Sequence, residues 1–525
     1  SGVSGVSGVS GVSGVSGVSG RWRKTGHPIW ALLLLSAGCA SAPEPAPVVP
    51  QDHQPPVIPT ATPVTVQQAA NPHTSPPDLP AVKPLTVPAV MERTLSNGLR
   101  LLIVEHHELP VVDLQLVIRS GGEADPAARQ GVATLVAGLL DEGTASRNAL
   151  QIADQLAYLG ATIGTTSGWD ASRITLHAPT AKLDSALALM ADVTLRPTFP
   201  GNELERLRQE RLTALLQQRD LGPAIAGIAY HHILFGAEHP YGRPLQGNEA
   251  TTRAITRSDV QQFYTTYYRP NNATMIVVGS VKPDDITQRI ERLFGGWQRG
   301  QVPVTRFPTA PASGATTVYM IDKPEAAQSS FRIGTVGVPR NTQDYFSILV
   351  MNTVLGGAFT SRLNQNLREI KGYTYGAGSS FDMRQAAGPF TASAEIETAK
   401  SDSALIEFMK ELRAIRTAVP AAELEKAKNY LQLGLPATFE TTGDIAARLA
   451  PIALFDLPLD YFNTYSQRIA AISATDVQRV AQQYVRPDQF NIVIVGDLKV
   501  IEARIRALKI GRVELRDLSG RPIVQ

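Results

Sequence analysis

Histidines beside carboxylates are the first residues in this chain whose types could do chemistry, because imidazole and carboxylate groups ligate zinc. The largest such group combines residues 231–232 (His-His) with residues 238–239 (Glu-His). Residues 105–108 read Glu-His-His-Glu in a predicted turn, and His177 stands alone on a predicted strand. None of these spacings matches a familiar zinc-binding pattern. We therefore expect no metal site among these histidines.

The chain has one cysteine, Cys39, so a disulfide within one chain is excluded. It follows a basic segment at residues 21–24, an apolar stretch at residues 29–35 and small residues at 36–38. This order matches a secretory signal and is too short for a membrane helix. It resembles a bacterial lipoprotein processing site, in which the cysteine is diacylated, although Ser36 departs from the larger aliphatic residue usual there. The alternative is ordinary signal cleavage beside an incidental cysteine.

The segments on either side of this signal predict no folded domain. Residues 1–20 are six Ser-Gly-Val triplets and a final Ser-Gly, which we interpret as an artefact of upstream translation. Residues 40–88 are rich in Pro, Ala, Val and Thr, and we expect a disordered tether. Ala40 and Ser41 lack the acidic residue associated with inner-membrane retention. We therefore expect a periplasmic protein that is lipid-anchored to the outer membrane of a Gram-negative bacterium.

Composition excludes several classes of function. The formal net charge is +2 and 18% of residues are charged, with no basic block typical of nucleic-acid binding. Mean hydropathy is −0.05, and no apolar run is long enough to span a bilayer. At 525 residues the chain exceeds a single hydrophobic core, so we expect two or more domains.

Alternating strands and helices are predicted from about Met91 onward. Residues 101–105 and 111–119 are typical of strands separated by a hairpin-like turn. Asp125-Pro126 is typical of a helix N-cap followed by proline at the first helical position. We expect that helix to continue to Glu142 and to end at Gly143.

An internal repeat predicts that one domain occurs twice. Residues 254–261 (Ala-Ile-Thr-Arg-Ser-Asp-Val-Gln) resemble residues 471–478 (Ala-Ile-Ser-Ala-Thr-Asp-Val-Gln). At the same spacing, the Arg-Pro pair and the apolar run ending in glycine at 269–279 recur at 486–496. We predict an α+β domain at residues 89–300, a linker at 301–315 and a second domain at 316–525.

Local motifs within these domains resemble the insulinase, pitrilysin and processing-peptidase family. They are Leu95-Ser-Asn-Gly-Leu99, Leu139-Leu-Asp-Glu-Gly-Thr144, His239-Pro-Tyr-Gly242 and Leu367-Arg-Glu-Ile-Lys-Gly-Tyr-Thr-Tyr375. The resemblance covers nearly all of the predicted folded chain. It implies two homologous α+β domains of the processing-peptidase type, each a mostly antiparallel sheet packed with helices, joined as one half of a clamshell.

Active members of that family bind zinc through H-x-x-E-H on a helix of the first domain. The two histidines ligate the metal, the glutamate acts as general base, and a distant glutamate completes the ligand set. Here Thr134, Ala137 and Gly138 stand in place of His, Glu and His. Glu210 matches the distant ligand, and we interpret it as a vestigial position on a solvated helix. The resemblance therefore implies no zinc and no other cofactor bound by this chain.

The second domain retains a pair that the family uses across its active site. Arg368 and Tyr375, seven residues apart, match an arginine and a tyrosine that reach toward the first domain's metal. An arginine fork can hold a substrate carbonyl or carboxylate, and a tyrosine hydroxyl can hydrogen-bond a developing oxyanion. The resemblance thus implies the non-catalytic subunit of a heterodimeric zinc peptidase, inactive alone, whose partner carries H-x-x-E-H and the zinc. Its substrates would be extended peptides.

Two other functions remain open from the sequence. One is a pseudo-peptidase that acts as a scaffold or peptide-binding protein, such as a homodimer, with no role in catalysis. The other is an autonomous peptidase with an unfamiliar metal site, for which the sequence offers no ligand set. Retention of Arg368 and Tyr375 favours the subunit of a split site, because a pure scaffold does not need them.

Overall fold

The computed structural model describes residues 87–312 and 314–523. The predicted signal segment, Cys39 and nearly all of the predicted tether lie outside the described residues. Everything described belongs to one unit, Val82–Gln525.

The first half of this unit is built on a six-stranded mixed sheet with the strand order β1-β2-β6-β3-β5-β4. Its strands are β1 (Met91–Thr94), β2 (Arg100–Glu105), β3 (Val111–Ile118), β4 (Thr162–Ser167), β5 (Ser172–Pro179) and β6 (Ala273–Gly279). Its helices are α1 (Val132–Leu139), α2 (Ala149–Leu159), α3 (Leu183–Leu195), α4 (Gly201–Gln218), α5 (Gly222–Phe235), α6 (Glu249–Ala254), α7 (Arg257–Tyr267) and α8 (Pro283–Phe294).

The second half carries another six-stranded sheet, with the order β12-β7-β11-β8-β10-β9. Its strands are β7 (Thr317–Asp322), β8 (Gln328–Val336), β9 (Thr374–Phe381), β10 (Pro389–Glu397), β11 (Asn491–Gly496) and β12 (Arg512–Arg516). Its helices are α9 (Tyr345–Asn352), α10 (Arg362–Asn364), α11 (Ser401–Ala414), α12 (Ala421–Gly434), α13 (Thr442–Phe455), α14 (Tyr465–Ala470), α15 (Ala474–Tyr484) and α16 (Leu498–Ala507).

The two sheets repeat one topology. The order β2-β6-β3-β5-β4 corresponds strand for strand to β7-β11-β8-β10-β9. The pairing senses also agree, since β2–β6 and β7–β11 are parallel and the three following pairs are antiparallel in both sheets. Only the added edge strand differs: β1 is antiparallel to β2, whereas β12 is parallel to β7. The predicted α+β fold with two homologous halves is therefore confirmed.

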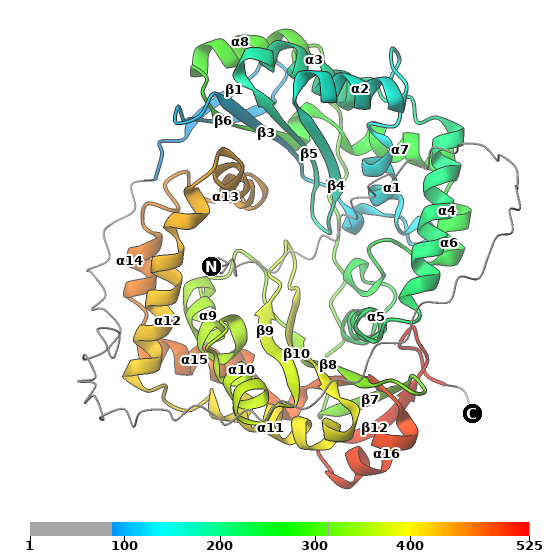
Figure 1. Ribbon diagram of the computed structural model, residues 1–525, viewed down its shortest axis with the longest axis vertical. Helices are drawn as coiled ribbons and strands as arrows, with labels where there is room; N and C mark the ends of the chain where they lie inside the picture. The colour runs from blue at the N-terminus through cyan, green and yellow to red at the C-terminus, as the bar shows by residue number, and fades with distance from the viewer. Residues whose placement is uncertain (1–86, 313, 524–525) are drawn as a thin grey trace, which may run out of the picture. The chain divides into compact units, whose positions relative to one another are not determined.

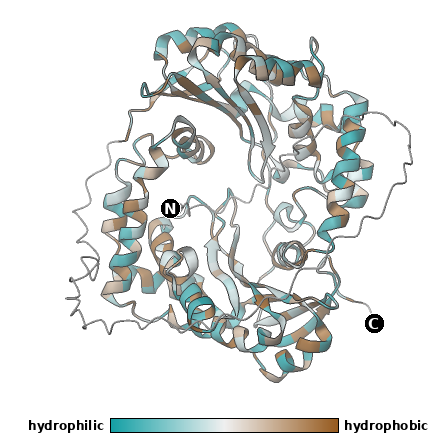
Figure 2. Ribbon diagram, in the orientation of Figure 1, coloured by the Kyte–Doolittle hydropathy of each residue, from teal (hydrophilic) through white to brown (hydrophobic). Residues whose placement is uncertain are grey.

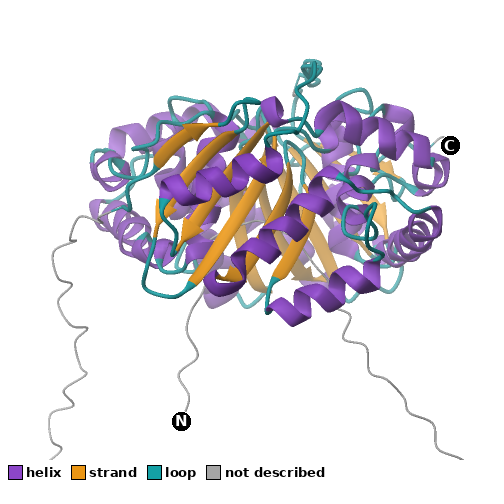
Figure 3. Cartoon of the chain, turned by 90° about the horizontal axis from the view of Figure 1, so that it is seen from above, coloured by secondary structure: helices purple, strands orange, loops and turns teal. Residues whose placement is uncertain are grey.

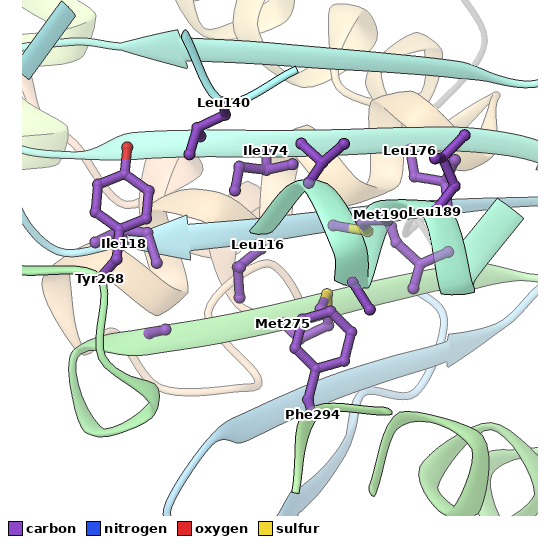
Figure 4. Close-up of a cluster of buried hydrophobic side chains, with 14 of the residues drawn as sticks. Leu116, Ile118, Leu140, Ile174, Leu176, Leu189, Met190, Tyr268, Met275 and Phe294 are labelled. Atoms are coloured by element: carbon purple, nitrogen blue, oxygen red, sulfur yellow. The ribbon is translucent and has the colours of Figure 1, made fainter. Parts of the chain in front are cut away.

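Alternate residues of each strand contribute to two different cores, as the period of a strand requires. In β2, Leu101 and Ile103 belong to the core beneath the helices of the first half, whereas Leu102 and Val104 face the opposite way. Figure 4 shows the first of these cores, where side chains of β3, β5 and β6 meet Leu189 and Met190 of α3 and Phe294 at the end of α8. The strands are thus buried on both faces.

The second face of each sheet is covered by a helix from the other half. Helix α13 packs on β3 and β6, where Leu449 and Ala450 join the core of Leu102 and Val104. Helix α5 packs on β8 and β11 of the second sheet, where Ile225 meets Val493 and Val495. Figure 1 shows α13 lying against the first sheet and α5 against the second, and Figure 3 shows helices crossing over the strands. The two halves therefore exchange helices and share the cores on these second faces, whereas the core on the first face of each sheet is built from its own half.

The helix predicted from Asp125 to Glu142 is wrong at both ends. Residues Gly122–Ala124 and Ala127–Arg129 form short 3-10 turns, and α1 starts only after Gly131, which has a φ of 95°. The Asp125 carboxylate instead caps α1 from a distance, accepting hydrogen bonds from the amides of Gly131 (2.6 Å) and Ala133 (2.9 Å). Helix α1 ends at Leu139, and Gly143 pairs with Asn148 in an isolated bridge.

The helical stretch Tyr345–Ile370 is long and apolar enough to cross a membrane by length and composition, which the sequence interpretation missed. Its most apolar 18-residue window is 56% buried, and the helix is interrupted between Gly357 and Arg362. These features are those of a core helix.

Candidate functional site

The five residues in the place of the zinc motif lie together on α1, at the edge of the first core. Ala137 is fully buried, and Thr134 and Gly138 are half-buried. Helix α4 packs against α1 here, and a Cβ added at Gly138 would touch Leu207 Cδ1 at 3.6 Å. The helix therefore presents a hydroxyl, a methyl and a bare backbone where metal chemistry needs two imidazoles and a carboxylate.

An arginine occupies the neighbourhood of Thr134. Arg211 on α4 donates from Nη2 to Thr134 Oγ1 (2.8 Å) and from Nη1 to the Gly131 carbonyl (2.8 Å). Burial lowers the pKa of Arg211 to about 10, which still leaves it charged at neutral pH. A fixed positive charge bonded to Thr134 opposes binding of a divalent cation at the same place.

Glu210, at the position of the family's distant metal ligand, is also bound by an arginine. Figure 2 colours most of α4 as hydrophilic, and Glu210 is exposed on it. Arg206 bonds Glu203 (2.7 Å) and Glu210 (2.9 Å) along the helix and also pairs with Glu142, just after α1. Hydrogen bonds to these carboxylates, that of Glu142 first, raise the pKa of Arg206. A guanidinium thus stands at the centre of three carboxylates.

These residues do not fit zinc. Among the described residues, no group of three or more His, Cys, Asp or Glu side chains could hold a metal ion. The chemistry of the set agrees, since the two cations Arg206 and Arg211 take up the oxygen atoms of Glu203, Glu210 and Thr134. No step of a reaction can be derived through a metal on this chain.

Two histidines of the largest group, His231 and His239, have structural partners. His231 stacks on Trp169, with ring centroids 6.2 Å apart, and its Nδ1 donates to the Gly227 carbonyl (2.9 Å). His239 Nδ1 accepts from the Tyr241 amide (3.0 Å). Burial lowers the pKa of His231 and of His239 to about 4, so both rings are neutral at pH 7.

The chain around Arg368 explains its spacing from Tyr375. Arg368 lies in a π-helical turn, Gln365–Ile370, a geometry frequent at functional sites. The helix ends through Gly372, which has a φ of 65°, and the Tyr373 amide donates to the Leu367 carbonyl (2.9 Å). Strand β9 then begins at Thr374, so Tyr375 follows within one turn of the end of the helix.

Both members of the pair are accessible to a ligand. The Tyr375 side chain is 91% exposed on β9, the edge strand of the second sheet, and has no hydrogen-bond partner among the described residues. Arg368 is half-exposed, bonds Glu369 Oε1 at 3.3 Å and lies over the ring of Phe359, 4.5 Å from its centroid. The helical turn and β9 pack together, so the structure brings both residues to one end of the second half.

Strand β4 forms the equivalent edge of the first sheet and packs against α1. No hydrogen bond from another described element reaches the outer side of its backbone. The outer side of β9 is different, because the side chains of Asn352 and Asn364 bond the Ser379 carbonyl (2.9 Å) and the Ala377 amide (3.1 Å). An unpaired edge is a template for an added strand. Of these two edge strands, β4 is therefore the one whose outer backbone edge can pair with an added strand.

Sequence reasoning missed a buried cluster where the halves meet, formed by Trp169, Asp170, Tyr241 and Arg384. The Arg384 guanidinium carbon lies over both rings, 4.7 Å from the centroid of Trp169 and 4.6 Å from that of Tyr241, and these two rings contact each other edge to face. Asp170 accepts from Tyr241 Oη (2.6 Å) and from the Gln385 amide (2.7 Å). Trp169 and Asp170 lie at the β4–β5 tip and Arg384 lies at the equivalent β9–β10 tip, and no pattern in the sequence indicated that these two tips meet. The cluster joins the two halves.

Comparison with known proteins identifies the family that this chain resembles. The model described as "Insulinase (Peptidase family M16)" matches residues 100–224, and "Peptidase M16 inactive domain" matches residues 254–431. An uncharacterized zinc protease of Mycobacterium leprae is 25% identical over 427 residues, covering 80% of this chain and 95% of the relative. The non-peptidase homolog YmxG of Helicobacter pylori is 24% identical over 401 residues, covering 75% and 91%. A solved peptidase M16 inactive domain from Pseudomonas fluorescens superimposes with a TM-score of 0.73 at 27% identity, covering 78% and 98%.

Proposed function

This chain belongs to the insulinase family of peptidases, family M16, and from that premise we propose that it is the zinc-less subunit of a two-chain zinc peptidase. It is a family member of the inactive type, because Thr134, Ala137 and Gly138 replace the metal ligands and the general base. The partner would be a homologous chain with an intact H-x-x-E-H motif, and the zinc chemistry would belong to that partner.

One contrast within the molecule carries the proposal. At the metal position of the first half, Arg211 bonds Thr134. In the second half, Tyr375 on the edge strand β9 is open to solvent, and Arg368, in the helical turn that packs on β9, is half-exposed. A chain that had lost every catalytic role would have no reason to keep an exposed tyrosine and a stacked arginine together, since exposed aromatic groups offer little to stability.

The two side chains would act on a substrate held at the partner's metal site. The planar Arg368 guanidinium would donate two hydrogen bonds to a carbonyl or carboxylate of the peptide and so fix its position. The Tyr375 hydroxyl would donate to the peptide oxygen as negative charge develops on it. Such a donor lowers the barrier only where it binds the transition state better than the substrate.

The substrate class follows from the open outer edge of β4 in the first sheet. An extended peptide fits an edge strand, where main-chain hydrogen bonds supply affinity independent of sequence. The chain lacks a basic block, and its net charge of +2 gives no reason to expect nucleic acid. We therefore propose unstructured peptides as substrates.

Reconstitution tests this function. The mature chain, the H-x-x-E-H chain and their mixture are each measured for zinc content and for cleavage of an unstructured peptide mixture. We expect zinc in the partner, and efficient cleavage only in the mixture. Stoichiometric zinc and cleavage by this chain alone would contradict the proposal.

We also propose that Cys39 is acylated and that the protein is held on the periplasmic side of the outer membrane. The support is the order of basic, apolar and small residues before Cys39. Expression with labelled palmitate and fractionation of membranes test it. Wild type should carry label in the outer-membrane fraction, and Cys39→Ser should release an unlabelled protein; equal labelling of both would overturn the assignment.

A scaffold without catalytic role is the second candidate, and one observation favours it: the Helicobacter relative is called a non-peptidase homolog. In that case the mixture would bind peptides, yet its cleavage rate would equal that of the partner alone. The reconstitution therefore separates the two functions.

A further inference from the structure

We propose that Phe359 is the positioning residue for Arg368, and that Asn364 holds Phe359 in place. The inference rests on the proposed function of Arg368 and deepens it. It concerns a residue that no motif in the sequence singles out.

Phe359 has an unusual position for a large apolar side chain. Its ring is 61% exposed, yet the Arg368 guanidinium carbon lies 4.5 Å from the ring centroid. The other charged partner of Arg368 is Glu369, its neighbour in the chain, at 3.3 Å. A side chain paired only with its neighbour would sample several rotamers, whereas a ring against one face of the guanidinium restricts it.

Asn364 fixes the loop that carries this ring. The Asn364 side chain is 4% exposed, and its Nδ2 donates to the Phe359 carbonyl (2.7 Å) while its Oδ1 accepts from the Ala377 amide (3.1 Å). One buried amide therefore joins the Phe359 loop to β9, the strand that also carries Tyr375. The loop that contacts Arg368 and the strand that carries Tyr375 are thus both held by the same buried side chain.

A second contact holds the same loop against β9. A Cβ added at Gly356 would lie 2.3 Å from the Ser379 amide nitrogen, so only glycine permits this approach. Asn352 bonds the Ser379 carbonyl from the preceding helix (2.9 Å). The loop between α9 and α10 therefore has little freedom to carry Phe359 away from Arg368.

The consequence is a pre-oriented arginine. With one face covered by Phe359, the guanidinium keeps its donor edge available to a peptide carbonyl or carboxylate. Orientation before binding reduces the rotamer freedom that is lost when the substrate docks. Phe359 therefore acts through Arg368, without contact to the reacting atoms.

The test uses the complex of this chain with its H-x-x-E-H partner. Phe359→Leu removes the ring and keeps an apolar side chain, Phe359→Tyr keeps the ring, and Ile406→Ala on α11 is a control at another half-exposed apolar residue. We expect Phe359→Leu to lower kcat/KM about two- to fivefold, and Phe359→Tyr and Ile406→Ala to leave it unchanged. In an Arg368→Met background, Phe359→Leu should have no further effect.

A second readout tests positioning without turnover. Selective ¹⁵N labelling of arginine Nε reports the order of the Arg368 side chain in the full chain, with Arg368→Lys used to assign its signal. The order parameter should fall in Phe359→Leu and stay at the wild-type value in Phe359→Tyr. Unchanged order in Phe359→Leu would overturn the inference.

The outcomes separate this inference from the function on which it rests. If Arg368→Met lowers turnover and Phe359→Leu does not, Phe359 is no positioning residue and the proposed function stands. If Arg368→Met leaves turnover unchanged, the proposed function of Arg368 fails. In that case an ordered Arg368 would have no catalytic meaning, and the inference falls with it.

Discussion

At the scale of single residues, the loss of the metal site is more than a loss of ligands. Arg211 bonds Thr134, and Arg206 bonds Glu203, Glu210 and Glu142. These cations connect α1 to α4, which in an active relative the metal would also do. Guanidinium contacts therefore connect α1 and α4 at the place where the family's motif would bind a metal.

Restoring the motif should accordingly fail to restore the metal. We predict that Thr134→His, Ala137→Glu and Gly138→His together do not give stoichiometric zinc, because Arg211 and Arg206 remain and Ala137 is fully buried. A glutamate at that buried place should also lower the free energy of unfolding by several kcal/mol. Zinc analysis and denaturant unfolding check both points; one zinc per chain at unchanged stability would contradict them.

His231 should make part of the stability pH-dependent. Burial, and then the nearby Arg384, lower its pKa to about 4 from an ordinary 6.5, against the opposing effects of Asp382 and the Gly227 carbonyl. Between these values the unfolded chain binds a proton that the native ring does not. The free energy of unfolding should therefore fall as pH drops from about 6.5 to about 4.

Across this pH range His231 should lower the free energy of unfolding by about 2 kcal/mol. This is less than the pKa shift alone would give, because solvent screens a partly exposed ring. It is measured as the difference between wild type and His231→Gln across this range. The subtraction is needed because Asp125, with a pKa raised to about 7 by burial, changes stability in the opposite direction. A difference that does not vary with pH would refute the assignment.

At the scale of elements, the end of the helix before β9 determines where Arg368 and Tyr375 lie. Gly372→Ala should lower the free energy of unfolding by about 1 kcal/mol, because its φ of 65° is unfavourable for a residue with a Cβ. Gly434→Ala is the matched control, at a helical glycine with open space and no positive φ, and should be neutral or stabilising. Equal effects of both substitutions in denaturant unfolding would argue against a left-handed cap.

Some elements could be predicted from the sequence and others could not. Residues 101–105 and 111–119 were predicted as strands, and the structure confirms β2 and β3 there. The hairpin predicted between them is wrong, because β6, from much later in the chain, lies between β2 and β3 in the sheet. The start of α1 was predicted wrongly because Asp125 caps the helix across a loop, and local patterns cannot distinguish this from a cap in place. Phe359 escaped notice for a similar reason: one aromatic residue in a loop has no period, and its contact with Arg368 is tertiary.

At the scale of the whole molecule, the repeat predicted two equivalent halves, and the matching strand order confirms them. The repeat did not predict that α5 and α13 would each pack on the sheet of the other half. An apolar helix face indicates burial without indicating which sheet buries it. The exchange also means that the second face of each sheet is buried by a helix of the other half.

The halves should therefore unfold together. Leu449→Ala on α13 removes a fully buried side chain that packs on the first sheet, and should cost about 2–5 kcal/mol. Hydrogen exchange should then speed up in β3 and β6 of the first half as well as in α13 itself. Loss of protection confined to the second half would show that the two cores are energetically separate.

The central claim is that this chain supplies Arg368 and Tyr375 to a metal site it does not contain. The most direct measurement is kcat/KM of the reconstituted complex with Arg368→Met, Tyr375→Phe or both in this chain. We predict that each single variant lowers kcat/KM at least tenfold while the zinc content of the complex stays constant. Wild-type turnover by the double variant would contradict the account and leave the protein a scaffold.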